Sequence, residues 1–384
     1  MKHIYLFGIS LMMLGCHSSN DPEKNLNAAM VASVPEPALS PEEQQQYAAL
    51  ATSFFDSCLR RNQFNGAILV AKNGVVVYEK YLGYKNIRAK DTLTAQTPLQ
   101  IASTSKTMTS AAVLQLVQQG KLDLETPVAQ FFPGFPYEDI TVKMLLNHRS
   151  GLPEYLYFFE KNGWNRNTYA TNDDVIRAII NWKPPRSFRA NTRFDYCNTN
   201  FALLASIVEK VSGMPFPQYM KQNIFEPLQM NNTYVFTIND TARSAQSYDW
   251  NGAQWAMDFS DGVYGDKNVY STPQDLLKWD QALYTDQVVS RQLLDSAFTP
   301  YSHEKPSLHN YGLGWRLLVY PQGKKVVYHN GRWHGFNSAF ARLTDEKVTI
   351  VMLVNKFNKN VYTIARKMYN SFGDYEANHI GEVE

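Results

Sequence analysis

The chain has 384 residues, of which 44% are hydrophobic and 13% aromatic, and its formal net charge is +2. This length and composition allow a sizeable core in one large domain or two modest ones. A near-neutral charge without a basic stripe argues against a nucleic-acid partner. No internal stretch approaches the roughly 18 consecutive apolar residues of a membrane span.

The first 16 residues have the pattern of a secretion signal. Lys2 precedes an apolar run over residues 4–14, and Gly15 and Cys16 follow. This pattern predicts a signal peptide over residues 1–15. The Leu-Gly-Cys triplet that ends at Cys16 resembles the end of a bacterial lipobox, which implies lipidation of that cysteine. A plain cleaved signal or a buried cysteine is the alternative. With two acyl chains as anchor, we expect an exported, membrane-anchored lipoprotein that faces the periplasm or the cell surface.

The next segment is polar and dotted with prolines. Residues of this composition cannot bury enough apolar surface to fold alone, so we expect residues 16–45 to form a flexible tether. Residues 46–380 are then expected to form one folded domain. Apolar residues at helical spacing predict an amphipathic helix from Pro41 to about Asn62.

A hairpin and a helix are predicted next. Two β-rich runs, 67–71 and 75–78, flank Asn73-Gly74, which is the strongest short hairpin signal. A helix follows from Ser103 to Gln119. Helical patterns and loops dominate between about residues 120 and 300, where further helices are predicted over residues 200–211 and from residue 273.

The end of the chain returns to β-rich segments. These are residues 313–319, 325–329, 337–343 and 348–355, and a final helix is predicted over 360–371. Strands at both ends with helices between them predict an α+β fold. One antiparallel sheet is then built from both termini and flanked by helices, with a mostly helical region inserted at about 120–300. A single site is expected in the cleft between the sheet and this region.

The first of three clusters with chemical potential is Ser103-Thr104-Ser105-Lys106. Residues three apart at the start of a helix lie on one face, so Lys106 can accept the proton of the Ser103 hydroxyl. A lysine with a pKa of about 10.4 is a poor base at neutral pH, and the hypothesis therefore requires a desolvated Lys106. Ser103 as a simple N-cap is the alternative. A second Ser-x-x-Lys, Ser302 to Lys305, lacks an amphipathic helix behind it and is expected to be a surface loop.

The second cluster is Tyr196-Cys197-Asn198, in a predicted turn before a helix. The phenol of Tyr196 could relay a proton to a leaving group, and the amide of Asn198 could hold a substrate carbonyl. A packed aromatic side chain and a helix N-cap are the alternatives. Cys197 itself and Cys58 are expected to be small buried residues, although a disulfide between them stays open.

The third cluster, His329-Asn330-Gly331, is expected at the end of a strand beside Ser103. Glycine lets a substrate backbone approach closely. The N–H of the following Arg332 could pair with the N–H of Ser103 as an oxyanion hole. An exposed histidine in a glycine-rich turn is the alternative.

Together the three clusters resemble those of the serine β-lactamase-like family, in the branch of class C β-lactamases, D,D-carboxypeptidases and related esterases. The resemblance covers roughly residues 46–370, and further segments that carry it are residues 145–153, 213–230, 269–279 and 331–338. It implies a β-lactamase/D,D-peptidase-like fold, with nucleophile Ser103, base Lys106, proton relay Tyr196 and a substrate-binding strand at His329–Arg332.

The third cluster departs from the Lys-Thr-Gly of class C β-lactamases. A lysine would bind a β-lactam carboxylate as a fixed charge, whereas histidine is only partly charged at neutral pH. We therefore expect an ester or amide hydrolase, acting on a small molecule or a peptide that contains D-amino acids, rather than an efficient β-lactamase. Before the second cluster, Ala190-Asn191 stands where the family often has Pro-Gly, which bears on loop shape.

The sequence leaves rival functions open. A β-lactamase and a penicillin-binding D,D-carboxypeptidase share the expected chemistry, whereas a surface lipoprotein that keeps the fold as a non-catalytic binding module does not. An α/β-hydrolase is disfavoured because the chain has no Gly-x-Ser-x-Gly. No spacing of cysteine and histidine typical of zinc occurs, so neither a metal nor a cofactor is expected.

Overall fold

The computed structural model describes residues 39–59 and 64–375. The predicted signal peptide, the predicted lipidation site Cys16 and most of the predicted tether lie outside the described residues.

The first described helix, α1 (Pro41–Leu59), starts where it was predicted. Ser40 and Glu43 form a capping box there, because the Ser40 N–H donates to the Glu43 carboxylate at 2.8 Å and the Glu43 N–H donates to the Ser40 hydroxyl at 3.2 Å. Residues 41–45 are therefore helical, and their assignment to the tether is corrected.

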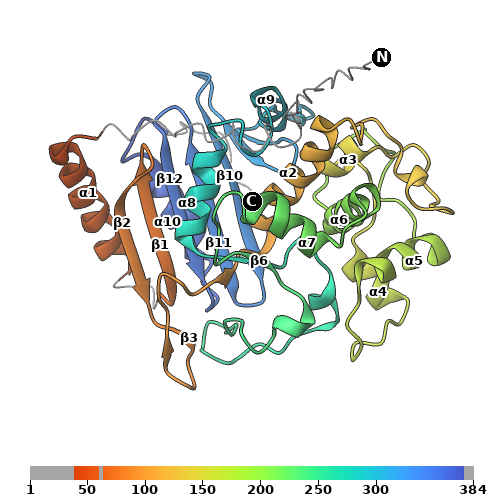
Figure 1. Cartoon of the computed structure of the whole chain (residues 1–384), viewed down its shortest axis with the longest axis horizontal. Helices are drawn as coiled ribbons and strands as arrows, with labels where there is room; N and C mark the ends of the chain where they lie inside the picture. The colour runs from red at the N-terminus through yellow and green to blue at the C-terminus, as the bar shows by residue number, and fades with distance from the viewer. Residues whose placement is uncertain (1–38, 60–63, 376–384) are drawn as a thin grey trace, which may run out of the picture. The chain divides into compact units, whose positions relative to one another are not determined.

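A seven-stranded antiparallel sheet in the order β2-β1-β12-β11-β10-β9-β8 occupies the centre of the described domain (Figure 1). The strand from the start of the domain, β1, pairs with β12 from its end, so that Gly66 lies opposite Val354. The prediction of one sheet built from both termini is confirmed. The strands are β1 (Gly66–Lys72), β2 (Val75–Leu82), β8 (His309–Tyr311), β9 (Arg316–Val319), β10 (Lys325–Trp333), β11 (Phe336–Leu343) and β12 (Val348–Val354).

Alternating side chains of these strands enter two separate cores. Ile68 and Val70 of β1 pack with α1 and α10 (Asn360–Tyr369) on one face, whereas Leu69 and Ala71 face the opposite core. That second core includes the helices α2 (Ser105–Gln118) and α8 (Pro273–Ala282). Because both faces are covered, all seven residues of β12 are buried, as expected of a central strand.

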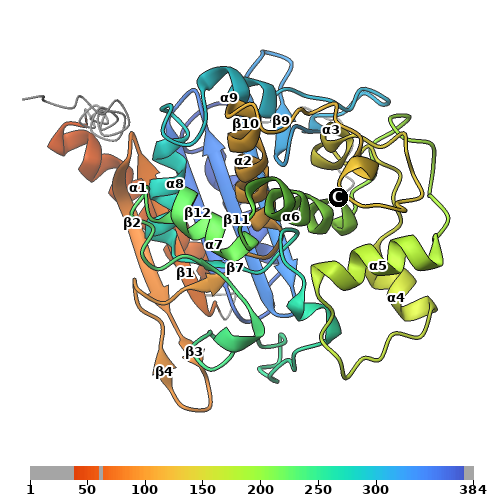
Figure 2. The same cartoon turned by 45° about the vertical axis from the view of Figure 1, so that its right-hand side comes forward.

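The region between residues 101 and 308 supplies most of the helices. Besides α2 and α8, these are α3 (Val142–Leu146), α4 (Tyr155–Lys161), α5 (Asn172–Trp182), α6 (Asn198–Ser212), α7 (Phe216–Met220) and α9 (Arg291–Ala297). Figure 2 shows α3, α4, α5 and α6 to the side of the sheet. The α+β architecture and the helical character of the insertion were predicted.

Outside the main sheet there are short strands that the sequence did not reveal. A three-stranded sheet has the order β5-β7-β6, with β5 (Leu99–Gln100), β6 (Tyr234–Val235) and β7 (Val269–Ser271). A further pair joins β3 (Tyr84–Asn86) to β4 (Asp91–Thr92). Strands of two or three residues are too short to show an alternating pattern, which is why they were missed.

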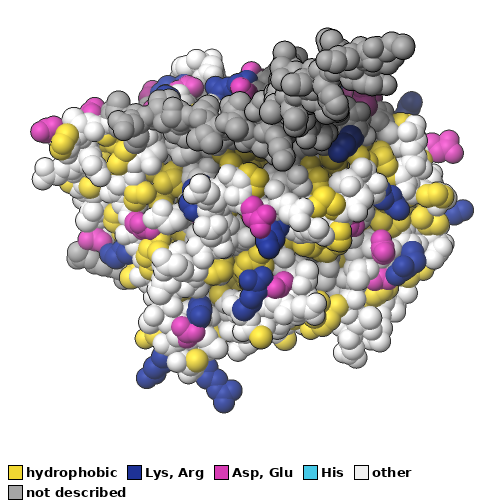
Figure 3. Space-filling view, viewed as in Figure 1, with side chains coloured by type: hydrophobic (Ala, Val, Ile, Leu, Met, Phe, Trp, Pro, Cys, Tyr) yellow, Lys and Arg dark blue, Asp and Glu magenta, His cyan; other side chains and the backbone are white. Residues whose placement is uncertain are grey.

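The surface agrees with the composition of the chain. Basic and acidic side chains are interspersed on the described part of the face shown in Figure 3, which fits the formal net charge of +2. A bilayer-spanning helix is not found in residues 39–59 and 64–375.

Candidate active site

Ser103 lies in a tight turn, η1 (Ala102–Thr104), that leads directly into α2. The predicted helix over residues 103–119 therefore starts as this 3₁₀ turn. Ala102 has φ 46°, a left-handed conformation that costs energy in a residue with a Cβ. Local strain of this kind is concentrated at functional sites, and here it precedes a serine that is partly exposed between buried neighbours.

Lys106 is 0% exposed and its ammonium group reaches three oxygens. Nζ donates to Ser103 Oγ at 3.2 Å, to Asn198 Oδ1 at 2.8 Å and to the carbonyl of Asp266 at 2.6 Å. The amide and carbonyl oxygens can only accept hydrogen bonds. If Lys106 acts as the base, its neutral amine keeps two N–H groups on these oxygens and its lone pair is free to accept the Ser103 proton. The Lys106 side chain is buried, as the sequence-based hypothesis requires.

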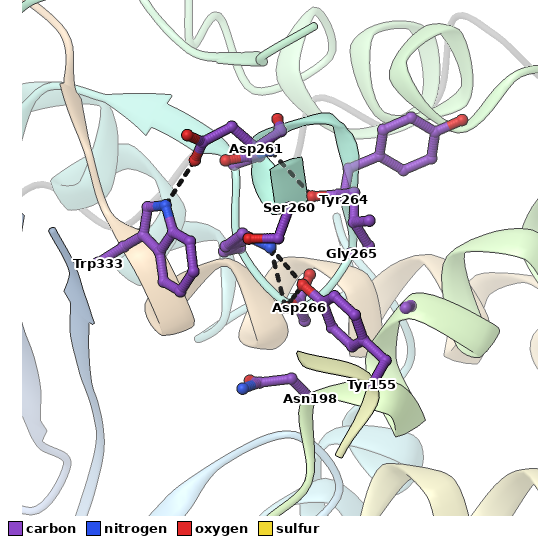
Figure 4. Close-up of polar contacts among 12 residues, drawn as sticks. Tyr155, Asn198, Ser260, Asp261, Tyr264, Gly265, Asp266 and Trp333 are labelled. Atoms are coloured by element: carbon purple, nitrogen blue, oxygen red, sulfur yellow. Dashed lines mark hydrogen bonds and ion pairs between the residues drawn. The ribbon is translucent and has the colours of Figure 1, made fainter. Parts of the chain in front are cut away.

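The carbonyl of Asp266 belongs to a loop that is fixed by a buried network (Figure 4). The Asp266 carboxylate accepts the Tyr155 hydroxyl at 3.2 Å and pairs with Lys267 Nζ at 3.4 Å, while Lys267 also donates to the Tyr155 hydroxyl at 2.5 Å. An added Cβ at Gly265 would lie 2.4 Å from the Phe201 carbonyl, so the loop rests directly on α6. Sequence reasoning missed this loop, because its contribution to the site is a main-chain oxygen.

The second cluster lies at the start of α6, with Cys197 as its N-cap. The Tyr196 ring is 4.9 Å from Lys106 Nζ and 5.2 Å from the Cζ of Arg316. Asn198 is the first helical residue and turns its side chain toward Lys106, so the N-cap alternative does not hold for it. Burial raises the pKa of the Cys197 thiol, which therefore stays protonated and does not compete as a nucleophile.

Glu154 supports this cluster from the neighbouring loop. Its Oε2 accepts the backbone N–H of Asn198 at 2.8 Å, a free donor of the α6 N-terminus. Its Oε1 is buried and has no hydrogen-bond partner among the described residues. Burial raises the pKa of Glu154, since the contact with Asn198 only partly offsets desolvation. Glu154 directly follows the family-like segment 145–153, and this position is the one signal that could have drawn attention to it.

The third cluster lies within β10 rather than at the end of a strand, because β10 continues to Trp333. Gly331 is pressed against the turn of Ser103, and an added Cβ would be 2.3 Å from the Ile101 carbonyl and 2.9 Å from the Ser103 nitrogen. Tyr362 donates to the Gly331 carbonyl at 2.8 Å. A trans peptide directs its N–H opposite to its carbonyl, so the N–H of Arg332 points away from Tyr362.

The side chain of His329 is 0% exposed, in contrast to the expected exposed or partly charged histidine. Its Nδ1 donates to the Asn330 carbonyl at 2.7 Å, which leaves Nε2 to accept the Tyr311 hydroxyl at 3.1 Å. Burial, with the charges of Arg316 and Lys106, holds the pKa of His329 well below its usual range. The imidazole is therefore neutral and engaged within the protein, and only the backbone of His329 is left to contact a substrate.

A pocket of about 380 Å³ opens beside Tyr196 and Glu154. Tyr157 is 74% exposed and lines this pocket together with Phe158. The neighbouring aromatic residues belong to the packing of the helical region, with Tyr155 and Phe159 buried and Trp164 stacked on Phe159.

One group of side chains among the described residues has donor atoms close enough for a cation. Asp258, Asp261 and His334 place one ligand atom each within 4.8 Å of one another. The Asp261 carboxylate already accepts Trp333 Nε1 at 2.6 Å and contacts His334 Nε2 at 3.3 Å. These hydrogen bonds account for the grouping.

Three comparisons place the chain among known proteins. The Beta-lactamase family pattern matches residues 21–372. Penicillin-binding protein 4* of Bacillus subtilis is 33% identical over 326 residues, which cover 81% of this chain and 72% of that protein. A D-aminopeptidase of Brucella canis is 24% identical over 310 residues, which cover 80% of this chain and 59% of that protein.

The fold is shared with a penicillin-binding protein from Bacillus halodurans, whose crystal structure superposes with a TM-score of 0.73. The identity is 24%, and the match covers 83% of this chain and 98% of that one. This likeness shows the fold. With the family match over residues 21–372, the chain belongs to the Beta-lactamase family of serine hydrolases.

Proposed function

We propose that the protein forms an acyl-enzyme on Ser103 and hydrolyses an ester or amide bond. The observation that carries this proposal is the environment of Lys106, whose amine lies 3.2 Å from Ser103 Oγ while Asn198 and the Asp266 carbonyl occupy its other donors. A nucleophile within hydrogen-bond reach of a base that a third group orients is the arrangement that covalent catalysis requires.

Acylation begins when the neutral Lys106 amine takes the Ser103 proton. The Oγ–carbon bond forms as the carbonyl π bond opens, and the electron pair moves to the carbonyl oxygen. The N–H groups of Ser103 and Arg332 are assigned to this oxyanion. Removal of one such donor typically lowers the rate by about 10²–10³-fold.

Collapse of the intermediate restores the carbonyl and breaks the bond to the leaving group. The leaving nitrogen or oxygen takes a proton from Tyr196, which regains one from the Lys106 ammonium 4.9 Å from its ring. Water, activated by Tyr196 and Lys106, then attacks the acyl carbon, and its proton passes through the Tyr196 hydroxyl to the neutral Lys106 amine. The bond from the acyl carbon to Ser103 Oγ breaks, and Ser103 Oγ takes back a proton from the Lys106 ammonium.

The substrate is assigned to the amides and esters of D-amino acids. The relatives named as a penicillin-binding protein and a D-aminopeptidase support this class. The aromatic pocket beside Tyr196 supports an apolar group on the substrate. We do not propose efficient β-lactam hydrolysis, because the neutral His329 cannot supply the fixed positive charge that would bind a β-lactam carboxylate.

A fluorophosphonate probe tests the nucleophile without knowledge of the substrate. Intact mass is measured after treatment of the wild type, Ser103→Ala and Lys106→Met. We expect one adduct on the wild type, none on Ser103→Ala, and labelling slowed by about 10²-fold or more in Lys106→Met. No adduct on the folded wild type would contradict the proposal and favour a non-catalytic binding module.

We also propose that the protein is exported and anchored through a lipidated Cys16, on the strength of the sequence pattern alone. Membrane and soluble fractions of cells that express the wild type or Cys16→Ser would test it. The wild type should remain in the membrane fraction and the variant should leave it. Equal distribution of the two would refute the anchor.

A further inference from the structure

A second pocket, of about 190 Å³, is lined by residues that take no part in the proposed acyl transfer. Its walls come from the loop over residues 236–261, from β5 and β7, and from the turn between β10 and β11. Trp333 of this lining lies two residues beyond Gly331 on β10, and alternate residues of a strand point to one face. Because Gly331 faces Ser103, the pocket lies on the same side of the sheet as the nucleophile.

Aromatic side chains form part of the wall of this pocket. Trp255 is 45% exposed and stacks on the His334 imidazole, with ring centroids 5.4 Å apart. Tyr270 and Phe336 meet edge to face at 5.8 Å and are both buried. An aromatic face carries partial negative charge and attracts polarised C–H groups. The pocket therefore offers a surface on which a ligand with C–H groups on its face can stack.

Polar side chains lie between these rings. Tyr270 is 5% exposed, and its hydroxyl has no hydrogen-bond partner among residues 39–59 and 64–375. Gln254 donates one amide N–H to the oxygen of Gln246, which leaves the N–H groups of Gln246 and the oxygen of Gln254 for a ligand. A polar group that is buried without a partner costs free energy. A ligand that fills the pocket must therefore carry both donors and acceptors.

The charges of the lining argue against an ionic ligand. Lysine and arginine are absent from the described lining, so an anion would find no counter-ion there. The carboxylate in the lining, Asp261, already accepts Trp333 Nε1 at 2.6 Å (Figure 4). It also accepts the backbone N–H of Asp258 at 2.7 Å and lies 3.3 Å from His334 Nε2. Because these groups occupy both of its oxygens, Asp261 is poorly placed to bind a cation.

We infer that this second pocket binds a sugar. A pyranose ring is uncharged, presents C–H groups on its faces and carries hydroxyl groups around its edge. Trp255 stacks on a face of the ring, and the hydroxyl edge bonds to Tyr270 and to the free amide groups of Gln246 and Gln254. The pocket is smaller than the 300–1,000 Å³ or so that holds a drug-sized ligand, so it takes one ring rather than a chain of them.

The probe for this inference is methyl N-acetyl-β-D-glucosaminide, an uncharged sugar whose acetamido group adds an N–H donor and a carbonyl acceptor. Its binding to the full chain is measured by saturation-transfer-difference NMR, which requires no turnover. We expect saturable binding with a dissociation constant on the order of 1 mM, as befits so small a ligand. Ser103→Ala should bind the probe with the same affinity, since the nucleophile does not line the pocket.

Two variants locate the bound sugar. Trp255→Ala removes the stacking surface, and Tyr270→Phe removes the hydroxyl while the ring keeps its stacking on Tyr234. Each should weaken binding by about 3-fold to 10-fold. Trp250→Ala is the matched control, because Trp250 is 67% exposed on the same loop and does not line the pocket. It should bind the probe as the wild type does.

Three results would overturn the inference. Absence of saturable binding by the wild type is the first, and equal affinities of the Trp250 and Trp255 variants are the second. Loss of binding in Ser103→Ala is the third, since it would place the sugar in the catalytic cluster. Butylammonium tests the rival ligand class: if it binds to the wild type and not to Trp255→Ala, while the sugar does not bind, the pocket is a cation site. None of these results depends on labelling of Ser103, so the proposed function is tested separately.

Discussion

The Nδ1 atom of His148 accepts the backbone N–H of Cys197 at 3.1 Å. This hydrogen bond fixes the backbone between Tyr196 and Asn198. The same Nδ1 atom is 3.0 Å from the Asn200 amide nitrogen, so Nδ1 carries no proton. Nε2 is buried and has no partner among the described residues. The geometry of the second cluster therefore depends on a neutral histidine in the segment 145–153.

This relationship predicts that the protein loses stability in mild acid. Burial, reinforced by the charge of Lys106, holds the pKa of His148 well below its usual value of about 6.5. The unfolded chain then binds more protons than the native state, so the free energy of unfolding falls as the pH drops below about 6.5. His329 contributes with the same sign.

Urea unfolding between pH 7.5 and pH 5 measures this loss, which should reach at most about 1.4 kcal/mol per pH unit for each histidine. His148→Gln is the control, because an amide oxygen can accept the Cys197 N–H without titrating. An equally steep decline in that variant would show that His148 is not responsible.

A second prediction concerns Glu154, whose pKa is raised chiefly by burial. The native state then holds the proton to a higher pH than the unfolded chain, so the stabilisation by protonated Glu154 is complete below about pH 4.5 and is lost as the pH rises through the native pKa. Glu154→Gln removes this loss and should be as stable as the wild type, or about 1 kcal/mol more stable, at pH 7.5.

The same variant should react more slowly at Ser103. A neutral amide accepts the Asn198 N–H less strongly than a carboxylate does, so Asn198 is held less firmly against Lys106. We expect fluorophosphonate labelling to slow by about 10-fold while the melting temperature does not fall. A parallel drop in both quantities would mean that Glu154 is simply a structural residue.

Gly331→Ala should impair the site through steric conflict. The added methyl group would lie 2.3 Å from the Ile101 carbonyl and would push β10 away from Ser103. Because an error of about 1 Å in catalytic geometry can reduce the rate by about 10²-fold, we expect a loss of this order in the labelling rate. Gly323→Ala is the control, since its Cβ meets nothing within 4 Å and its φ of 85° strains only the turn between β9 and β10. Similar labelling rates in the two variants would contradict the prediction.

The local motifs and the strands at the chain ends could be predicted from the sequence, because helix spacing and turn residues act over a few positions. The contributions of Glu154 and Asp266 could not, since each depends on a distant segment that packs against α6. The neutral state of His329 is of the same kind, because it requires Tyr311 and Arg316 from neighbouring strands. Short-range pattern points to the groups that we propose to react, whereas their surroundings are set by tertiary packing.

Tyr157→Ala should alter substrate preference more than stability. The ring is 74% exposed and lines the pocket beside Tyr196, so its removal exposes little new apolar core. We expect the melting temperature to stay within about 2 °C of the wild type, while kcat/KM falls by about 10-fold for acyl groups with a bulky aromatic substituent and little for acetyl groups. A large fall in melting temperature with an unchanged preference would refute this role.

Because β1 pairs with β12, the main sheet is complete only after β12 has been synthesised. The serine and lysine are synthesised within the first third of the sequence, but the strand against which they pack, β10, is flanked by β9 and β11 near the end. A partly synthesised chain therefore carries the nucleophile without its oxyanion partner and without the sheet that shapes the turn at Ser103. Truncation before β12 should yield an unreactive serine, and the long loop that must close before the sheet forms favours slow folding. On the proposed function, Ser103 therefore becomes reactive towards acyl groups only after β12 has joined the sheet.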